Sequence, residues 1–335
     1  DCYGGNIGAS IKITAHDYFP RFPNNVVAHD VKTAPKVFEF EAFGEHVGWG
    51  VVPNCRVSEF IERMKFVEEC DGAGAYIRVS WEAMSGPSAL DCLSDVNVFA
   101  LSEIVKGNKD AVTITKSWLE KHYDITDEAL ITELADCMLK SWEVIANAYM
   151  DDKVFPRHSR LPSSWEEGWH SMLTSGMGNR HLEKGVFALN DIGLNDTDLV
   201  RIFAEKEEAS KLAKQLWQRV LLVLVDCPEN LRDDLALPFE LLAYYAQKFE
   251  FAIKGTLICA INQVDAEALY LDELEECIRS LEMIAHQLEI IINGKAKYAP
   301  HTVSVLFDPS HIQSFADSLK KTLAKKKPCL IKNRA

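Results

Sequence analysis

The sequence predicts an α/β region followed by an all-α region. Up to about residue 95, short β-branched and aromatic runs are separated by Gly, Pro and Asn. Beyond that point, apolar residues recur at helical spacing almost to the end of the 335 residues. A hydrophobic fraction of 47% and a charged fraction of 26% are typical of globular proteins, which excludes a disordered or fibrous chain.

Three runs in the first region predict strands, at residues 10–16, 36–45 and 74–82. Between the last two, residues 57–69 place their apolar side chains on one face, which predicts an amphipathic helix. Strand, helix and strand in this order form a βαβ unit. We therefore expect parallel strands.

The middle strand carries acidic residues at alternate positions. Glu39, Glu41 and Glu45 should share one face. A parallel sheet buried on both faces has apolar strands, so this acidic face favours the lumen and rim of a β/α barrel. Arg78 of the next strand could pair with one of these carboxylates. The alternative is an edge strand with a solvated acidic face.

The second region predicts a helical domain. Two long apolar stripes, at residues 130–149 and 274–291, indicate core or a subunit interface, and we expect a homodimer through them. The remaining predictions are helices at 209–225, 238–251 and 312–323, a long loop at 155–181, and a solvated basic tail at 320–334.

The net charge and the spacing of the cysteines exclude several classes of protein. With 36 basic and 50 acidic residues, the net charge of −14 argues against a nucleic-acid partner. Nine scattered cysteines form neither a disulfide framework nor a zinc motif, which favours a cytoplasmic protein. No apolar run reaches the length of a membrane span, and no phosphate-binding or serine-hydrolase motif occurs.

Carboxylates at strand ends remain as candidates for chemistry. Asp17 follows the first strand and Glu45 ends the second, and the ends of neighbouring parallel strands lie close together. Two carboxylates facing one point can hold and deprotonate a water molecule. Lys12 and Arg21 flank Asp17 and suit an anionic substrate. This chemistry requires no metal and no cofactor.

The same residues resemble a known family, the glycoside hydrolase family 67 α-glucuronidases. The pattern K-x4-D-[FY]-x2-R-x-P followed by E-[FL]-x4-E-x2-G is matched without a gap, including the 28-residue interval between the two catalytic acids. A looser likeness extends over roughly the first 125 residues. The matching positions are Lys12, Asp17, Tyr18, Arg21, Pro23, Glu39, Phe40, Glu45 and Gly48.

The resemblance implies an inverting enzyme that releases (4-O-methyl)glucuronic acid from xylan-derived oligosaccharides. Asp17 and Glu45 would be the pair that activates water, Lys12 and Arg21 substrate-binding residues, and Glu39 a structural residue. Residues 1–105 would supply the last three strands of a (β/α)8 TIM barrel, and residues 106–335 a C-terminal helical domain. The family's general acid lies on an earlier strand, so we expect it upstream of residue 1.

The sequence departs from the family pattern at two places near these acids. His46 replaces the aromatic residue that usually follows the second acid, and Phe19 and Pro20 replace polar residues after the first. Glu82 is the only nearby carboxylate at another strand end, and the resemblance gives it no role. A related glycosidase of other specificity, or a non-catalytic carbohydrate-binding or assembly fragment, are the alternatives.

Overall fold

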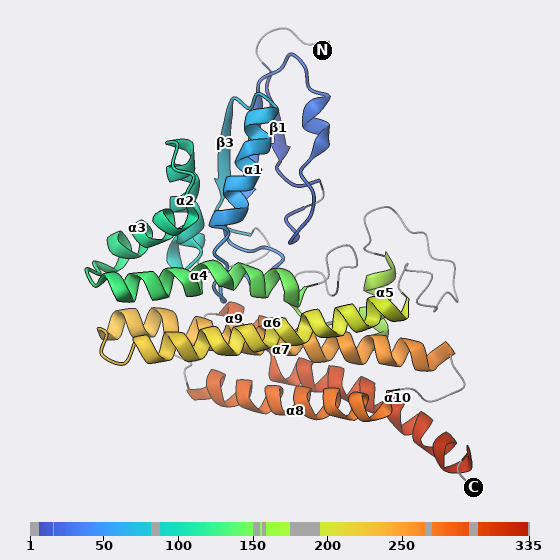
Figure 1. Cartoon of the computed structure of the whole chain (residues 1–335). Coiled ribbons are helices and arrows are strands. Elements are labelled where there is room, and N and C mark those ends of the chain that lie inside the picture. The colour runs from blue at the N-terminus through green and yellow to red at the C-terminus, as the bar shows by residue number, and fades with distance from the viewer. Residues whose placement is uncertain are drawn as a thin grey trace. The chain divides into compact units, whose positions relative to one another are not determined.

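The computed structural model describes residues 7–15, 17–81, 88–149, 155, 159–174, 195–264, 270–294 and 301–333. A small parallel sheet is followed by a region made of helices, so the predicted α/β and then all-α layout is confirmed (Figure 1). The chain forms two compact units, Asp1–Ala146 with Ala213–Leu242, and Asn147–Leu212 with Ala243–Ala335. These two units do not test the predicted division into domains at residues 1–105 and 106–335, which stays a prediction.

The sheet has three strands in the order β1-β2-β3, namely Ala9–Lys12, Lys36–Glu41 and Gly74–Arg78. Both pairs are parallel, as predicted. Each strand starts at or within one residue of its predicted start but ends four residues early. β1 and β2 end early because the backbone bends or turns soon after each of them and leaves the hydrogen-bonded ladder.

Helix α1, Val57–Glu69, has the predicted bounds and packs against the apolar face of β2. Phe40 and Phe60 are both fully buried, with ring centroids 5.1 Å apart. Phe38 meets Phe66 at 6.1 Å in the same edge-to-face manner. These contacts bury one face of β2 against α1. The acidic side chains of the strand therefore lie on the opposite face.

The other helices follow the predicted apolar stripes, with one exception. The expected loop at 155–181 contains α5, because Trp165, Trp169 and Met172 form a buried stripe at helical spacing. The basic tail is also helical as far as Asn333. The bounds are η1 Val26–His29, η2 Ala89–Asp91, α2 Asp95–Val105, α3 Ala111–Tyr123, α4 Glu128–Ala148, α5 Trp165–Thr174, α6 Asp196–Val223, α7 Glu229–Val264, α8 Leu271–Gly294, α9 His301–Leu306 and α10 Pro309–Asn333.

Most residues of both long stripes are buried within the single chain. Leu134 and Met138 of α4 are fully buried, as are Leu281 and Leu288 of α8, which packs against α10. A dimer interface would therefore use other residues, and the homodimer stays a prediction. The described helices include none that is long and apolar enough to cross a bilayer.

Candidate functional site

Asp17 lies in a folded-back loop just beyond β1. Thr14 and Asn24 form an antiparallel bridge, and the amide of Ala15 donates to the Pro23 carbonyl at 3.0 Å. Within this loop Asp17 adopts a φ of +45°, a left-handed conformation that aspartate tolerates better than most residues. The hydroxyl of Thr14 donates to the Asp17 carbonyl. The loop thus fixes Asp17 near the C-terminal edge of the sheet.

Glu45 lies in the turn that follows β2. Gly44 has a φ of +86°, and its amide donates to the Glu41 carboxylate at 2.8 Å. The indole nitrogen of Trp49 donates to the Glu45 carbonyl at 2.9 Å. These contacts hold the backbone of Glu45, so its carboxylate has a defined position beside the end of β1.

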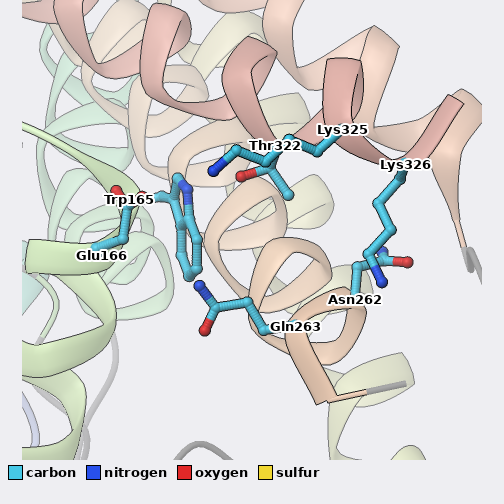
Figure 2. Close-up of a pocket in the computed structure, with 7 residues that line it drawn as sticks. All are labelled: Trp165, Glu166, Asn262, Gln263, Thr322, Lys325 and Lys326. Carbon is cyan, nitrogen blue, oxygen red and sulfur yellow. The ribbon is translucent and has the colours of Figure 1, made fainter. Parts of the chain in front are cut away.

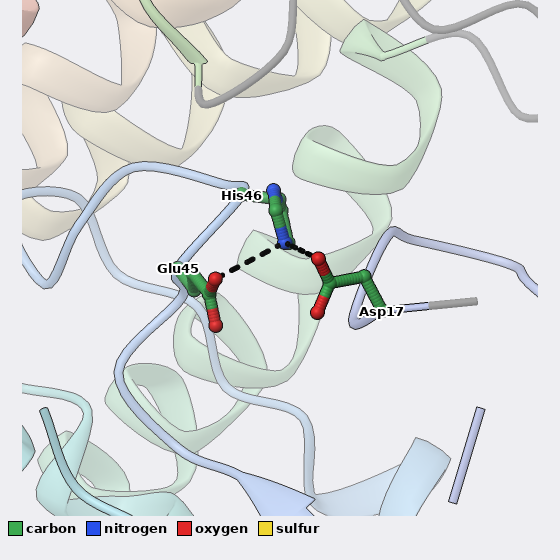
Figure 3. A group of neighbouring side chains, drawn as sticks. All are labelled: Asp17, Glu45 and His46. Atoms are coloured by element: carbon green, nitrogen blue, oxygen red, sulfur yellow. Dashed lines mark ion pairs between the residues drawn. The ribbon is translucent and has the colours of Figure 1, made fainter. Parts of the chain in front are cut away.

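The two carboxylates meet at His46, as Figure 3 shows. The Nε2 atom of His46 lies 3.1 Å from Asp17 Oδ2 and 3.5 Å from Glu45 Oε1. His46 is fully buried, whereas the side chain of Asp17 is 17% exposed. The predicted convergence of Asp17 and Glu45 is therefore confirmed.

A cation holds the second oxygen of each carboxylate. Lys12 Nζ lies 2.8 Å from Asp17 Oδ1, and Arg78 Nη1 lies 3.0 Å from Glu45 Oε2. The predicted pairing of Arg78 with a carboxylate of the middle strand is confirmed. Each acid thus has one oxygen on a cation and the other directed towards the imidazole.

These contacts keep Asp17 ionised. The close contact with His46 lowers the pKa of Asp17 well below its ordinary value, and Lys12 adds to this effect. Burial acts in the opposite direction but is outweighed. Asp17 is therefore a hydrogen-bond acceptor at any working pH and a weak base.

A second group of side chains, from the loop after β1 and from β3, surrounds Glu39. The hydroxyls of Tyr18 and Tyr76 both donate to Glu39, and Arg78 Nε lies 3.8 Å from it. Burial first and the bond to Glu39 second raise the pKa of Tyr18. Glu39 thus links three side chains beside the site, and the structural role expected for it stays a prediction.

Glu41, which the alternation of β2 places on the same face as Glu39, has a different partner. Glu41 is 2% exposed, and its carboxylate lies 3.1 Å from Arg56 at the start of α1. Burial raises the pKa of Glu41, and Arg56 opposes that rise. A buried arginine within reach is the physical reason, because a carboxylate in a low-dielectric interior requires a cationic partner.

Sequence reasoning treated His46 and Phe19 only as departures from the family pattern. In the structure they touch, with ring centroids 4.0 Å apart and planes tilted by 32°. Phe19 therefore supports the imidazole from one side while its Nε2 faces the two acids. The sequence contained a hint of this contact, because His46 directly follows Glu45 and Phe19 lies two residues after Asp17.

Asp17, Glu45 and His46 each offer one ligand atom, all within 4.8 Å of one another, which is a geometry that can hold a metal ion. Two charges already compensate the carboxylates, because Lys12 and Arg78 each hold one of them. A divalent cation would add to this positive charge. The expectation of a metal-independent site stays a prediction, and a chelator tests it below.

Two candidates remain, Arg21 and Glu82. Arg21 is exposed in the same loop as Asp17, with a φ of +59°, and its role as a substrate contact stays a prediction. Glu82 lies outside the described residues. No family model and no curated protein matches this chain, so the site is interpreted from its own geometry.

Proposed function

We propose that this chain carries the water-activating half of an inverting α-glucuronidase-like glycoside hydrolase. Its substrate would be an oligosaccharide from xylan that bears (4-O-methyl)glucuronic acid. One observation carries the proposal, namely that Asp17 and Glu45 follow adjacent parallel strands and converge, each paired with a cation. This is the arrangement that the resemblance to the α-glucuronidases implies.

The spacing of the two acids suits one water molecule. Their ligand atoms lie within 4.8 Å of each other. A hydrogen bond between oxygens spans about 2.5–3.0 Å, so a single water can donate to both carboxylates. Such a water would be held in a fixed orientation for attack on a sugar ring, as inversion requires.

The environments of the two acids suggest different roles. Asp17 has a strongly lowered pKa, so it would orient the water without taking its proton. Glu45 would accept the proton through Oε1, which lies 3.5 Å from His46 Nε2, while Arg78 Nη1 holds the other oxygen, Oε2, at 3.0 Å. Lys12, 43% exposed and 2.8 Å from Asp17, would bind the carboxylate of the uronic acid.

Our proposal for the fold is that β1, β2 and β3 are the last three strands of a (β/α)8 barrel. Two observations support it. The strands are adjacent in chain order, as barrel strands are, and no residue of β3 is fully buried, as expected for a strand that lacks a neighbour. A cytoplasmic location belongs to the same proposal, and the free thiols of the seven described cysteines support it.

Turnover of aldouronic acids by the complete polypeptide tests the proposed function. Because the resemblance places the general acid upstream of these strands, the assay requires the full-length protein. Asp17→Asn and Glu45→Gln should each lower kcat by at least about 100-fold, the scale of a lost general base. Lys12→Met should raise KM for uronic substrates more than for neutral analogues.

The exposed Glu62 of α1 provides the matched control, since Glu62→Gln makes the same change away from the site and should retain full activity. Treatment with EDTA should leave kcat unchanged. Wild-type rates in both Asp17→Asn and Glu45→Gln would reject the assignment. Binding of glucuronate without turnover by the wild-type protein would instead favour the non-catalytic alternative.

A further inference from the structure

The imidazole of His46 has a fixed position in the turn after β2. The amides of Val47 and Trp49 both donate to the Gly44 carbonyl, at 2.9 Å and 3.1 Å, so the backbone around His46 forms a closed turn. The ring of Phe19 lies 4.0 Å from the imidazole, and the side chain of His46 has no exposed surface. The imidazole therefore cannot itself contact a substrate.

The two acids that His46 contacts are both partly accessible. Its Nε2 atom lies 3.1 Å from Asp17 Oδ2 and 3.5 Å from Glu45 Oε1, and these side chains are 17% and 7% exposed. Lys12 and Arg78 hold the other oxygen of each acid. Two carboxylates this close repel each other, and a polar group in contact with both opposes their separation. With the imidazole in place, each carboxylate has a contact on both of its oxygens.

We propose that His46 is a positioning residue that fixes the orientation and the separation of Asp17 and Glu45. This inference rests on the proposed function. His46 is not a catalytic residue, because only the acids would reach the attacking water. Loss of the alignment of two catalytic groups slows the chemical step more than it weakens substrate binding. The effect of His46 should therefore appear in kcat.

Two substitutions separate the polar contact of His46 from the space that its ring fills. His46→Phe keeps a flat ring against Phe19 but removes Nε2. In the complete polypeptide it should lower kcat for aldouronic acids at least about tenfold and change KM by less than about threefold. His46→Gln can place an amide nitrogen where Nε2 lies, so its kcat should stay within about threefold of wild type. A role in packing alone would instead make His46→Phe the more active variant.

Urea unfolding of the complete polypeptide tests the contact without reference to turnover. His46→Phe and Asp17→Asn both remove the contact between Nε2 and the Asp17 carboxylate. The loss of stability in the double variant should therefore be smaller than the sum of the two single losses. The exposed His29 of η1 supplies the control cycle, because the losses from His29→Phe and Asp17→Asn should add.

Two substitutions outside this group of side chains are controls for turnover. His29→Phe repeats the change from histidine to phenylalanine. Glu166→Gln removes a carboxylate that lines a pocket among α5, α7 and α10, shown in Figure 2. Both variants should keep the wild-type kcat.

The outcomes separate this inference from the proposed function. A wild-type kcat in His46→Phe, an equal loss in His46→Gln, or additive losses of stability for His46→Phe and Asp17→Asn would each overturn the inference. If the wild-type protein does not hydrolyse aldouronic acids, the proposed function fails. The unfolding cycle then still decides whether His46 holds Asp17.

Discussion

At the scale of single residues, His46 is the feature that changes the view of the site. It is fully buried, touches both candidate acids through Nε2 and is supported by Phe19. Nε2 lies 3.1 Å from Asp17 Oδ2, and this contact orients the carboxylate and helps to keep it ionised. The imidazole therefore acts as a positioning residue, and Asp17 and Glu45 remain the groups that would contact water.

The lowered pKa of Asp17 predicts a pH-dependent contribution to stability. A carboxyl group whose pKa is lower in the folded state stabilises the fold above its unfolded pKa of about 3.9, and this contribution is lost as the pH falls below it. The difference in free energy of unfolding between wild type and Asp17→Asn should thus be largest near pH 7. It should shrink steadily from about pH 4 down to pH 2.

Urea unfolding at a series of pH values measures this difference. The exposed Asp30→Asn is the matched control and should stay close to wild type near neutral pH. A gap between wild type and Asp17→Asn that stays constant down to pH 2 would contradict the expected linkage.

Arg56 should be far more important for stability than a surface cation. It is 1% exposed and bridges Glu41 at 3.1 Å and Glu59 at 2.7 Å. Burial lowers the pKa of Arg56, but the neighbouring carboxylates, Glu59 above all, raise it by more. The net shift of the pKa is therefore upward. Arg56→Met would leave buried acids without their cation and should cost about 3–5 kcal/mol of unfolding free energy.

The surface pair of Lys65 and Glu62 supplies the comparison. These side chains lie 2.7 Å apart but are 52% and 68% exposed, so Lys65→Met should cost less than about 1 kcal/mol. Thermal or urea denaturation of both variants gives the two values. Similar losses in both would show that burial does not set the strength of the Arg56 contacts.

At the scale of elements, the turn between β2 and α1 positions the second acid. Gly44 has a φ of +86°, and a Cβ atom there would lie 2.5 Å from Asn54 Nδ2 and 2.7 Å from the Val47 carbonyl. Gly44→Ala should therefore destabilise the fold by about 2 kcal/mol or more. It should also displace the adjacent Glu45 and reduce turnover by the full-length protein.

Gly74 at the start of β3 is the matched control, because a Cβ atom there meets nothing within 4 Å. Gly74→Ala should change the unfolding free energy by less than about 1 kcal/mol in either direction. The midpoints of urea denaturation compare the two variants directly. Equal stability of Gly44→Ala and wild type would refute the claim that this turn requires glycine.

At the scale of the whole molecule, a buried lysine predicts how global stability depends on alkaline pH. Lys248 of α7 is fully buried and donates to the carbonyls of Ser159 and Leu306, both at 3.1 Å. Burial lowers its pKa to about 7, and the positive charge of Arg160 adds to this effect. Burial keeps the neighbouring Tyr245 neutral by raising its pKa far above 10.

A base whose pKa falls on folding binds its proton more readily in the unfolded chain. Between pH 7 and about 10.4, Lys248 should therefore make stability rise with pH, by at most about 1.4 kcal/mol for each pH unit. Guanidinium unfolding from pH 7 to 10 measures this slope. Lys248→Met should be flatter, and an equal slope in both proteins would contradict the assignment.

Features that depend on neighbouring residues in the chain could be predicted from the sequence. Alternation and helical spacing predicted three parallel strands and the bounds of α1, and the strand ends predicted that Asp17 and Glu45 converge. Helix α5 was missed because its short stripe of four apolar residues lies among Ser, Gly and Pro. Periodicity is a local property, so it is visible without the fold.

The partners of individual side chains became known from the three-dimensional fold. It separated Glu41 from Glu39 by placing Arg56 beside it, and it inserted His46 between the two acids. It also buried Lys248 beside the backbone carbonyls of Ser159 and Leu306. These outcomes depend on burial and on groups brought together from distant parts of the chain, which no local pattern of residues encodes.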